Sequence, residues 1–322
     1  MPPALHYPRE SLAAAEQDSF REERALQIRF VPALRATAVV AALAAVTLCA
    51  APPAGAEPPP RAPAARIPAG VTAGIAVYDR QTGAYTEQFN SHLRFRSASV
   101  VKLLLALDHL WPREAASPLP ADDREQLDAM LRSSDDSVAG DLWTRNGESS
   151  IIERMAARLG LADTAPPPSA YPGYWGYTSL SAADTVRIYR YILESAPAPV
   201  RDLIMGNLRA ATRLGTDGFD QGFGIAAAFD RPWAVKQGWS GFPPAGRAGA
   251  DRPRVAAAGG VDLAREALHT TGTVGTADRA IVAVLTLHPR GTPYDKACAD
   301  LGSLTRRLHV PGAVRTPRRP AP

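Results

Sequence analysis

Segments with the apolar pattern of β-strands lie at the two ends of one region of this chain and leave its middle to helices. Residues 71–79 and 84–89 are strand-like and are joined by a short turn, which predicts a β-hairpin. Residues 233–239, 267–275 and 279–287 have the same character. Between these two sets, apolar side chains recur at helical spacing. We therefore predict an α+β fold, in which an antiparallel sheet is assembled from both chain ends and a helical lobe is inserted between them.

The first part of the chain has the features of an export signal. Arg35 precedes an apolar run from about 36 to 50, and residues 54–56 (Ala-Gly-Ala) fit the small-x-small pattern of a signal-peptidase site. We expect an exported protein, either extracellular or associated with the cell envelope. The predicted division is an export signal with an atypical N-terminal extension at 1–56, a Pro/Ala-rich linker at 57–70, a folded domain at 71–309 and a basic disordered tail at 310–322.

Two features of this leader leave alternatives open. Residues 1–30 carry five acidic residues where a basic segment is typical, so one hypothesis places the true start codon near Val31. Cys49 could carry a lipid, although Leu48 stands where that signal has a small residue. After cleavage only Cys298 remains, so no disulfide can form within the mature chain.

The composition excludes several classes of partner. A formal net charge of +4 over 322 residues, with no basic block outside 315–320, gives no footprint for nucleic acid. The histidines have neither zinc spacing nor an evident place in a catalytic triad, so we expect no metal and no cofactor. The chain is long enough to build a sizeable core, and we expect it to act as a monomer.

A candidate nucleophile lies where the first helix is predicted to begin, at about Ser99. Ser99 and Lys102 are three residues apart and share one helix face. A serine at a helix N-terminus lies beside unpaired backbone N–H groups, which can stabilise an oxyanion. Lys102 could take the serine's proton if burial or a nearby cation lowered its pKa. Serine is also a common helix cap, so the pair alone does not establish catalysis.

Two further clusters follow in order along the chain: Ser134-Asp135-Asp136 on a helical stretch and Lys236-Gln237-Gly238 on a predicted strand. Together with Ser99 and Lys102 they resemble the motifs of the superfamily of serine β-lactamases (class A-like) and penicillin-binding D,D-peptidases. The resemblance covers about 71–308 and includes the order of helices and strands. It implies a β-lactamase/transpeptidase-like fold with acyl transfer to serine.

The resemblance also implies catalytic roles. Ser99 would be the nucleophile that forms an acyl-enzyme, and Lys102 would be its proton acceptor or relay. Ser134 would pass a proton to the leaving nitrogen. Lys236 would hold the substrate carboxylate and help to lower the pKa of Lys102.

Four substrate-binding positions follow from the same resemblance. Gly238 would let its strand lie close to the substrate, and the backbone N–H of Trp239 would complete the oxyanion hole with that of Ser99. Asp136 stands where the family has Asn; its carboxylate cannot donate a hydrogen bond as an amide can, but it could pair with Lys102. Gln237 replaces the usual Thr or Ser that binds the substrate carboxylate.

Two further departures concern the lobe and the loop before the helix predicted after Ser181. Ser134 follows Ser99 by only 35 residues, markedly fewer than is usual in the family. Class A β-lactamases use a glutamate of that loop to activate the deacylating water, but no Glu occurs between Glu153 and Glu194. The loop carries aromatic residues at 171–177 instead, which either pack over their own core or contact a sugar. Deacylation is therefore expected to be slow.

We thus predict an exported serine hydrolase or acyltransferase that acts on a peptidoglycan peptide or a β-lactam-like small molecule. Carboxypeptidase, esterase and slow β-lactamase activities all remain open. The alternative is a non-catalytic cell-envelope binding protein that retains the β-lactamase fold.

Overall fold

The computed structural model describes residues 67–111, 119–243 and 260–317. The export signal predicted at 1–56, most of the linker predicted at 57–70 and the last residues of the predicted tail lie outside the described residues. Among the helices of the described ranges, none is both long and apolar enough to span a bilayer.

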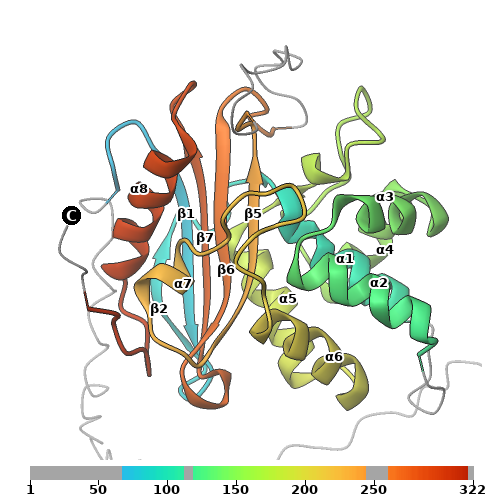
Figure 1. Ribbon diagram of the computed structural model, residues 1–322, viewed down its shortest axis with the longest axis horizontal. Coiled ribbons are helices and arrows are strands. Elements are labelled where there is room, and N and C mark those ends of the chain that lie inside the picture. Colours follow the sequence, from blue (N-terminus) through green and yellow to red (C-terminus); the bar gives the residue numbers. More distant parts are fainter. Residues whose placement is uncertain (1–66, 112–118, 244–259, 318–322) are drawn as a thin grey trace, which may run out of the picture. The chain divides into compact units, whose positions relative to one another are not determined.

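The central element is an antiparallel sheet in the strand order β2-β1-β7-β6-β5 (Figure 1). Its strands are β1 (Thr72–Asp79), β2 (Ala84–Phe89), β5 (Trp233–Ser240), β6 (Glu266–Val274) and β7 (Ala280–His288). Strand β7 lies between β1 and β6, so segments from the two ends of the domain are neighbours in the sheet. The predicted hairpin, the three late strands and the origin of the sheet at both chain ends are confirmed.

The position of β7 explains why its sequence is apolar without interruption from Ala280 to Leu285. All nine of its residues are buried. Ile281, Ala283 and Leu285 belong to a core shared with the helical lobe, whereas Val282 and Val284 belong to a second core on the opposite face. A strand that is covered on both faces needs apolar side chains at consecutive positions rather than at alternate ones.

Helices cover both faces of the sheet (Figure 1). The lobe and the helices continuous with it are α1 (Lys102–Leu110), α2 (Ala121–Arg132), α3 (Asp136–Arg145), α4 (Ser149–Leu159), α5 (Ala182–Glu194) and α6 (Ala198–Arg209). The opposite face is covered by α7 (Ile225–Ala228) and α8 (Tyr294–Arg306). Two short strands, β3 (Phe95–Arg96) and β4 (Ser179–Leu180), pair antiparallel outside the main sheet.

Local side-chain contacts explain where the helices that frame the site begin. The Ser181 hydroxyl accepts a hydrogen bond from the Asp184 backbone N–H at the start of α5 and so caps the helix predicted after Ser181. The Asp135 carboxylate caps α3 by accepting bonds from the backbone N–H groups of Ser137 and Val138. These caps fix the loops that precede both helices.

The boundary predicted at 309 is too early. Residues 310–317 do not form a free tail, because the Asp230 N–H donates to the Val314 carbonyl (2.8 Å) and the Thr316 N–H donates to the Ala228 carbonyl (3.1 Å). Val310 is buried in the core against α8. The polar, Pro-rich composition of the segment suggested disorder, but its backbone bonds attach it to the residues around α7.

Candidate active site

A cavity of about 520 Å³ lies where the end of β5 meets the helical lobe. Its wall is formed by the turn before α1, the start of α3, the aromatic loop 173–177, the loop residues 217 and 219, and residues 239–242 at the end of β5. Of the eight predicted site residues, Ser99, Asp136 and Trp239 line this cavity.

The turn that carries Ser99 is a 3₁₀ helix, Ala98–Val101, which leads directly into α1. The predicted helix start at Ser99 is thus confirmed as a helical turn, while regular α-helix begins at Lys102. Ala98 has a φ of +45°, a strained conformation for a residue with a side chain. The backbone before it is fixed by the Ser97 N–H, which donates to the Thr178 carbonyl (2.8 Å). Ser99 is only 6% exposed, but it lines the cavity.

Ser134 lies in the turn between α2 and α3 rather than on a helical stretch, which corrects the sequence prediction. Its φ of +57° is left-handed. Asp135 is the N-cap of α3 and Asp136 is the first residue of that helix. The left-handed turn ends one helix and starts the next, so Ser134 is 4% exposed between them.

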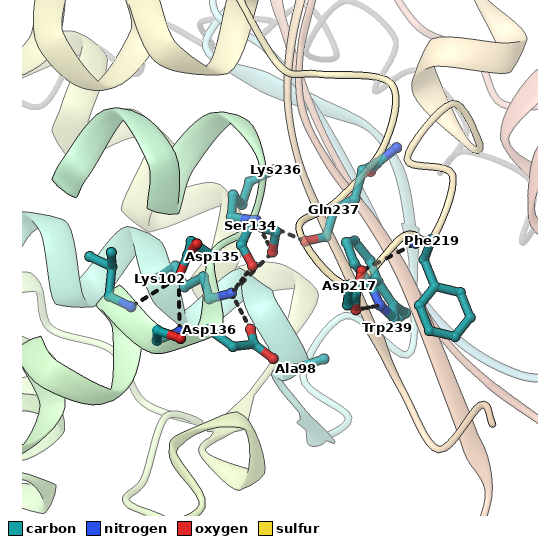
Figure 2. Close-up of polar contacts among 12 residues, drawn as sticks. Ala98, Lys102, Ser134, Asp135, Asp136, Asp217, Phe219, Lys236, Gln237 and Trp239 are labelled. Atoms are coloured by element: carbon teal, nitrogen blue, oxygen red, sulfur yellow. Dashed lines mark hydrogen bonds and ion pairs between the residues drawn. The ribbon is translucent and has the colours of Figure 1, made fainter. Parts of the chain in front are cut away.

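The amino groups of two lysines meet at the hydroxyl of Ser134 (Figure 2). The distance to Ser134 Oγ is 3.1 Å from Lys102 Nζ and 2.9 Å from Lys236 Nζ. Lys102 Nζ also donates to the Ser134 carbonyl at 2.6 Å. Three residues that are far apart in the sequence therefore form one hydrogen-bonded group, and one of them, Lys102, follows Ser99 by three residues.

Burial controls the protonation of both lysines. Both side chains are almost completely inaccessible to solvent. Burial lowers the pKa of Lys102, and the carboxylate of Asp136 acts in the opposite direction. Burial also lowers the pKa of Lys236 well below its usual value, and the positive charge of Lys102 adds to this effect. The lowered pKa expected for Lys102 is present, with burial as its largest cause.

Asp136 pairs with Lys102, as the sequence suggested. Its Oδ1 lies 2.6 Å from Lys102 Nζ. The Asp136 side chain is 64% exposed, whereas that of Lys102 is fully buried. The Asp136 carboxylate therefore lies between the buried amine of Lys102 and the cavity that Ser99 also lines.

Gln237 does not line the cavity, which corrects its predicted place in substrate binding. The side chain is 1% exposed. Its Nε2 donates to the carbonyls of Gln221 (3.1 Å) and Phe223 (2.8 Å). Successive side chains of a strand point to opposite sides, so Gln237 extends away from Ser134 while Lys236 reaches it (Figure 2). Gln237 holds the 221–223 loop against β5.

The packing around β5 gives a steric reason for glycine at position 238. A Cβ at this position would lie 3.1 Å from the Ser97 carbonyl oxygen and 3.3 Å from the Ser99 nitrogen. The absence of a side chain therefore lets β5 approach the turn that carries Ser99. Trp239 does line the cavity, and its Nε1 donates to Asp217 Oδ2 at 2.8 Å.

The aromatic loop 171–177 contributes to the cavity wall. Tyr174 and Tyr177 are stacked with their ring centres 5.1 Å apart, and both line the cavity. The ring centre of Trp175 lies 4.9 Å from Lys102 Nζ. The loop thus presents an indole to Lys102, and it contains no glutamate that could activate a deacylating water.

Asp163, the acidic residue at the start of this loop, has a structural role. Its Oδ2 accepts a hydrogen bond from the Ser181 hydroxyl (2.8 Å) and contacts His92 Nδ1 (2.8 Å). It is not part of the cavity wall. Its carboxylate is thus engaged in contacts that hold the loop to the start of α5.

Among the cavity-wall residues that sequence reasoning missed are Asp217, Phe219 and Phe242. Asp217 and Phe219 lie in the loop between α6 and α7, which has no periodic apolar pattern. The only available signal was the alternation of Gly, Asp and Phe at 215–223, which is typical of a structured loop rather than a linker.

Solved structures of class A β-lactamases and of the protein PBP-A have the same fold. A class A β-lactamase from Mycobacterium abscessus is 20% identical, with a TM-score of 0.51 over 74% of this chain and 92% of the other. A point mutant of PBP-A, solved as an acyl-enzyme complex with penicillin G, is 14% identical, with a TM-score of 0.52 over 74% of this chain and 89% of the other. The chain therefore has the β-lactamase/transpeptidase-like fold, as its motifs predicted.

Among curated proteins, the chain is similar to those named "Putative lipoprotein LppW" from Mycobacterium bovis and Mycobacterium tuberculosis. Identity is 38% over 175 residues, which cover 53% of this chain and 54% of each relative. The match thus spans about half the length of these relatives. No family model matches the chain.

Proposed function

We propose that this protein is an exported, envelope-associated serine hydrolase or acyltransferase that forms an acyl-enzyme at Ser99. The observation that carries the proposal is the shared hydrogen bonding of Lys102 and Lys236 to Ser134 Oγ, beside a cavity that Ser99 lines. Two buried lysines are expensive to retain in a core. Their convergence on a serine hydroxyl supports proton transfer more directly than it supports stability.

In the proposed reaction, Ser99 Oγ attacks the carbonyl carbon of an amide or ester and its proton passes to the neutral amine of Lys102. Backbone N–H groups of Ser99 and Trp239 receive the developing oxyanion. The carbon–nitrogen or carbon–oxygen bond then breaks, and Ser134 Oγ gives its proton to the leaving atom. The lysines replace that proton on Ser134.

The contacts of Ser134 favour this direction of transfer. A hydroxyl has two acceptor lone pairs and one donor hydrogen. Both lysines donate to Ser134 Oγ, so its own hydrogen is available to another acceptor. The nitrogen or oxygen that leaves the substrate is such an acceptor. The product of this step is an ester between the acyl group and Ser99.

Release of the acyl group is proposed to be slow. Hydrolysis of the ester needs a base that activates water, and the aromatic loop offers the Trp175 indole beside Lys102 instead of a carboxylate. Asp163 is engaged with Ser181 and His92, outside the cavity wall. An acyl-enzyme at Ser99 would therefore persist.

The proposed substrates are peptidoglycan peptides or β-lactam-like molecules. Support comes from the similar fold of the PBP-A point mutant, which has been solved as an acyl-enzyme with penicillin G. The name of the mycobacterial relatives, which describes them as lipoproteins, supports an envelope location together with the signal-like sequence at 31–56.

A second candidate is a binding protein without catalysis. The ion pair between Asp136 and Lys102 favours it, because an Asp136 carboxylate opposes the neutral form of Lys102 that proton transfer requires. The buried position of Gln237 also removes a predicted contact with substrate. In this case the cavity would hold a ligand reversibly.

Intact-mass measurement after incubation of the full chain with a penicillin and with an activated thioester distinguishes the two candidates. We expect a mass increase equal to one acyl group, which peptide mapping places on Ser99 and which persists for hours. Ser99→Ala should abolish it. Ser240→Ala, which removes another serine of the same cavity, should leave it intact. An unmodified wild-type protein with both reagents, or an adduct that persists in Ser99→Ala, would overturn the enzyme proposal and favour the binding protein.

A further inference from the structure

The cavity beside Ser99 is acidic and aromatic. Its wall contains the carboxylates of Asp136 and Asp217. Aromatic rings make up much of the remaining surface, with Tyr174, Trp175 and Tyr177 on one side and Phe219, Trp239 and Phe242 on the other. Within residues 67–111, 119–243 and 260–317, no Lys, Arg or His lines this cavity.

Hydrogen bonds orient the Asp217 carboxylate, but their donors do not neutralise its charge. Oδ2 accepts from the indole N–H of Trp239 at 2.8 Å, and Oδ1 accepts from the backbone N–H of Phe219 at 3.2 Å. Both donors are neutral groups. Two neutral hydrogen bonds orient a carboxylate, but they leave its formal charge facing the cavity.

The wall around Asp217 is also rigidly built. Tyr294 of α8 donates its hydroxyl to the Asp220 carbonyl at 2.9 Å. The same ring packs against Phe219 and Phe242, with ring centres 4.7 and 5.1 Å away. The loop that carries Asp217 is therefore attached to α8 through a partly buried aromatic cluster.

Three cations of the described ranges, Arg96, Lys102 and Lys236, are buried and do not line the cavity. Lys102 and Lys236 are buried at Ser134. Arg96 is 1% exposed and donates to the Ser240 carbonyl at 3.0 Å and to the Asp262 carbonyl at 2.8 Å. Among the residues that the structure describes, the cavity wall thus presents two carboxylates and several aromatic rings but no cationic side chain.

This lining has a clear chemical preference. A carboxylate in the cavity would be repelled by Asp136 and Asp217. A protonated amine would be attracted by both carboxylates, and the faces of Trp and Tyr rings add cation–π attraction. The cavity should therefore bind a protonated amine more tightly than a carboxylate. This is the reverse of the preference expected if Gln237 and Lys236 bound a substrate carboxylate.

We propose that this cavity selects ligands that present a protonated amine, rather than a carboxylate, next to the bond that Ser99 would attack. The proposal rests on the proposed acyl transfer and narrows its substrate class, so a penicillin, whose carboxylate lies next to the lactam bond, should acylate Ser99 more slowly than an uncharged thioester. Amine binding itself does not require Ser99 to react. Asp217 is the main specificity-determining residue, because its described partners leave its charge unpaired, whereas Asp136 contacts Lys102.

The test uses the full-length Ser99→Ala protein labelled with ¹⁵N, so that binding is read without chemistry. The chain has five tryptophans, and the indole N–H signal of Trp239, assigned with a Trp239→Phe variant, reports directly on Asp217. The probes are N-acetyl-lysine amide, the uncharged N-acetyl-norleucine amide of similar shape, and the anionic N-acetyl-glutamate amide. We expect the lysine probe to shift the Trp239 signal with at least about tenfold higher affinity than either other probe.

Asp217→Asn should reduce this preference to about threefold or less, because it keeps the shape of Asp217 and removes its charge. Asp202→Asn on α6 is the matched control, since Asp202 is exposed and paired with Arg201 away from the cavity. Equal affinity for the three probes, a preference for glutamate, or no response to the lysine probe would each overturn the proposal. Failure of Ser99 acylation would instead leave these titrations unchanged, so the two proposals fail separately.

Discussion

The indole ring of Trp175 lies over the amino group of Lys102, with 4.9 Å between the ring centre and Nζ. Trp175 belongs to the 3₁₀ turn Trp175–Tyr177, and Lys102 is the first residue of α1. The short β3–β4 pair and the Ser97–Thr178 hydrogen bond bring these segments together. The contact places an aromatic ring, rather than a carboxylate, beside the amine of Lys102.

Replacement of Trp175 by glutamate should therefore shorten the life of an acyl-enzyme. A carboxylate at this position would face Lys102 and could accept a proton from water. We expect Trp175→Glu to lose its acyl adduct at least about tenfold faster than wild type, as followed by intact mass after the excess reagent is removed.

Trp175→Gln is the control for this change, because it opens the same space without supplying a base. Its adduct should decay no more than about twofold faster than that of wild type. Equal decay of the Glu and Gln variants would show that access of water, rather than a missing base, limits deacylation.

Asp136→Asn should speed acylation. The Asp136 carboxylate raises the pKa of Lys102 against the effect of burial, so its removal lowers that pKa further and enlarges the neutral fraction of Lys102 at pH 7. The rising limb of the pH–rate profile should move to lower pH, and the rate at pH 7 should rise by roughly threefold to tenfold. A slower reaction, or a limb displaced to higher pH, would contradict this role of Asp136.

Gly238→Ala should impair the nucleophile turn. The new Cβ would meet the Ser97 carbonyl at 3.1 Å and the Ser99 nitrogen at 3.3 Å. We expect the free energy of unfolding to fall by about 1–3 kcal/mol and acylation to slow more than stability alone explains. Gly140→Ala on α3 is the matched control, because nothing lies within 4 Å of its added Cβ and it should stabilise the protein by about 1 kcal/mol. Urea titration and adduct formation measure the two effects.

The buried His269 should make the protein sensitive to mild acid. Its Nδ1 accepts a hydrogen bond from the Thr286 N–H, and its Nε2 contacts the Arg96 carbonyl at 2.8 Å. Burial lowers its pKa from 6.5 to about 4. Between these values the unfolded chain binds more protons than the folded one, so stability is complete above pH 6.5 and is lost as pH falls.

For His269 alone this loss should reach about 3 kcal/mol by pH 4. His269→Gln retains a donor and an acceptor but does not titrate, so the pH dependence of its unfolding free energy should be flatter by about that amount. His309→Gln, at an exposed position, is the control. Parallel curves for wild type and His269→Gln would exclude His269 as the source of acid sensitivity.

Much of the fold could be predicted from the sequence because its elements carry strong local patterns. The continuous apolar run of β7 and the caps at Asp135 and Ser181 are properties of short segments. The motif resemblance then supplied the long-range part, namely that Ser134 and Lys236 lie near Lys102. Periodicity alone could not have brought these three residues together.

The site residues that the sequence analysis placed differently or missed depend on backbone geometry and long-range contacts that the residue types do not determine. Ser134 adopts a left-handed φ that serine rarely takes, so its turn looked like a continuing helix. Gln237 is held by the carbonyls of Gln221 and Phe223, a loop contact that its residue type does not reveal. Asp217 lies on a loop, and its importance comes from the neighbouring indole of Trp239, which is distant in sequence.

The position of β7 has a consequence for the order in which the protein matures. Thr72 of β1 pairs with Leu287 of β7, so the middle of the sheet is supplied by one of the last strands to leave the ribosome. Until then the β1–β2 hairpin has an open edge that can pair with another chain. Contacts this distant in sequence form slowly. A chain that ends before β7 would therefore have an incomplete sheet with an unpaired β1 edge, which favours aggregation.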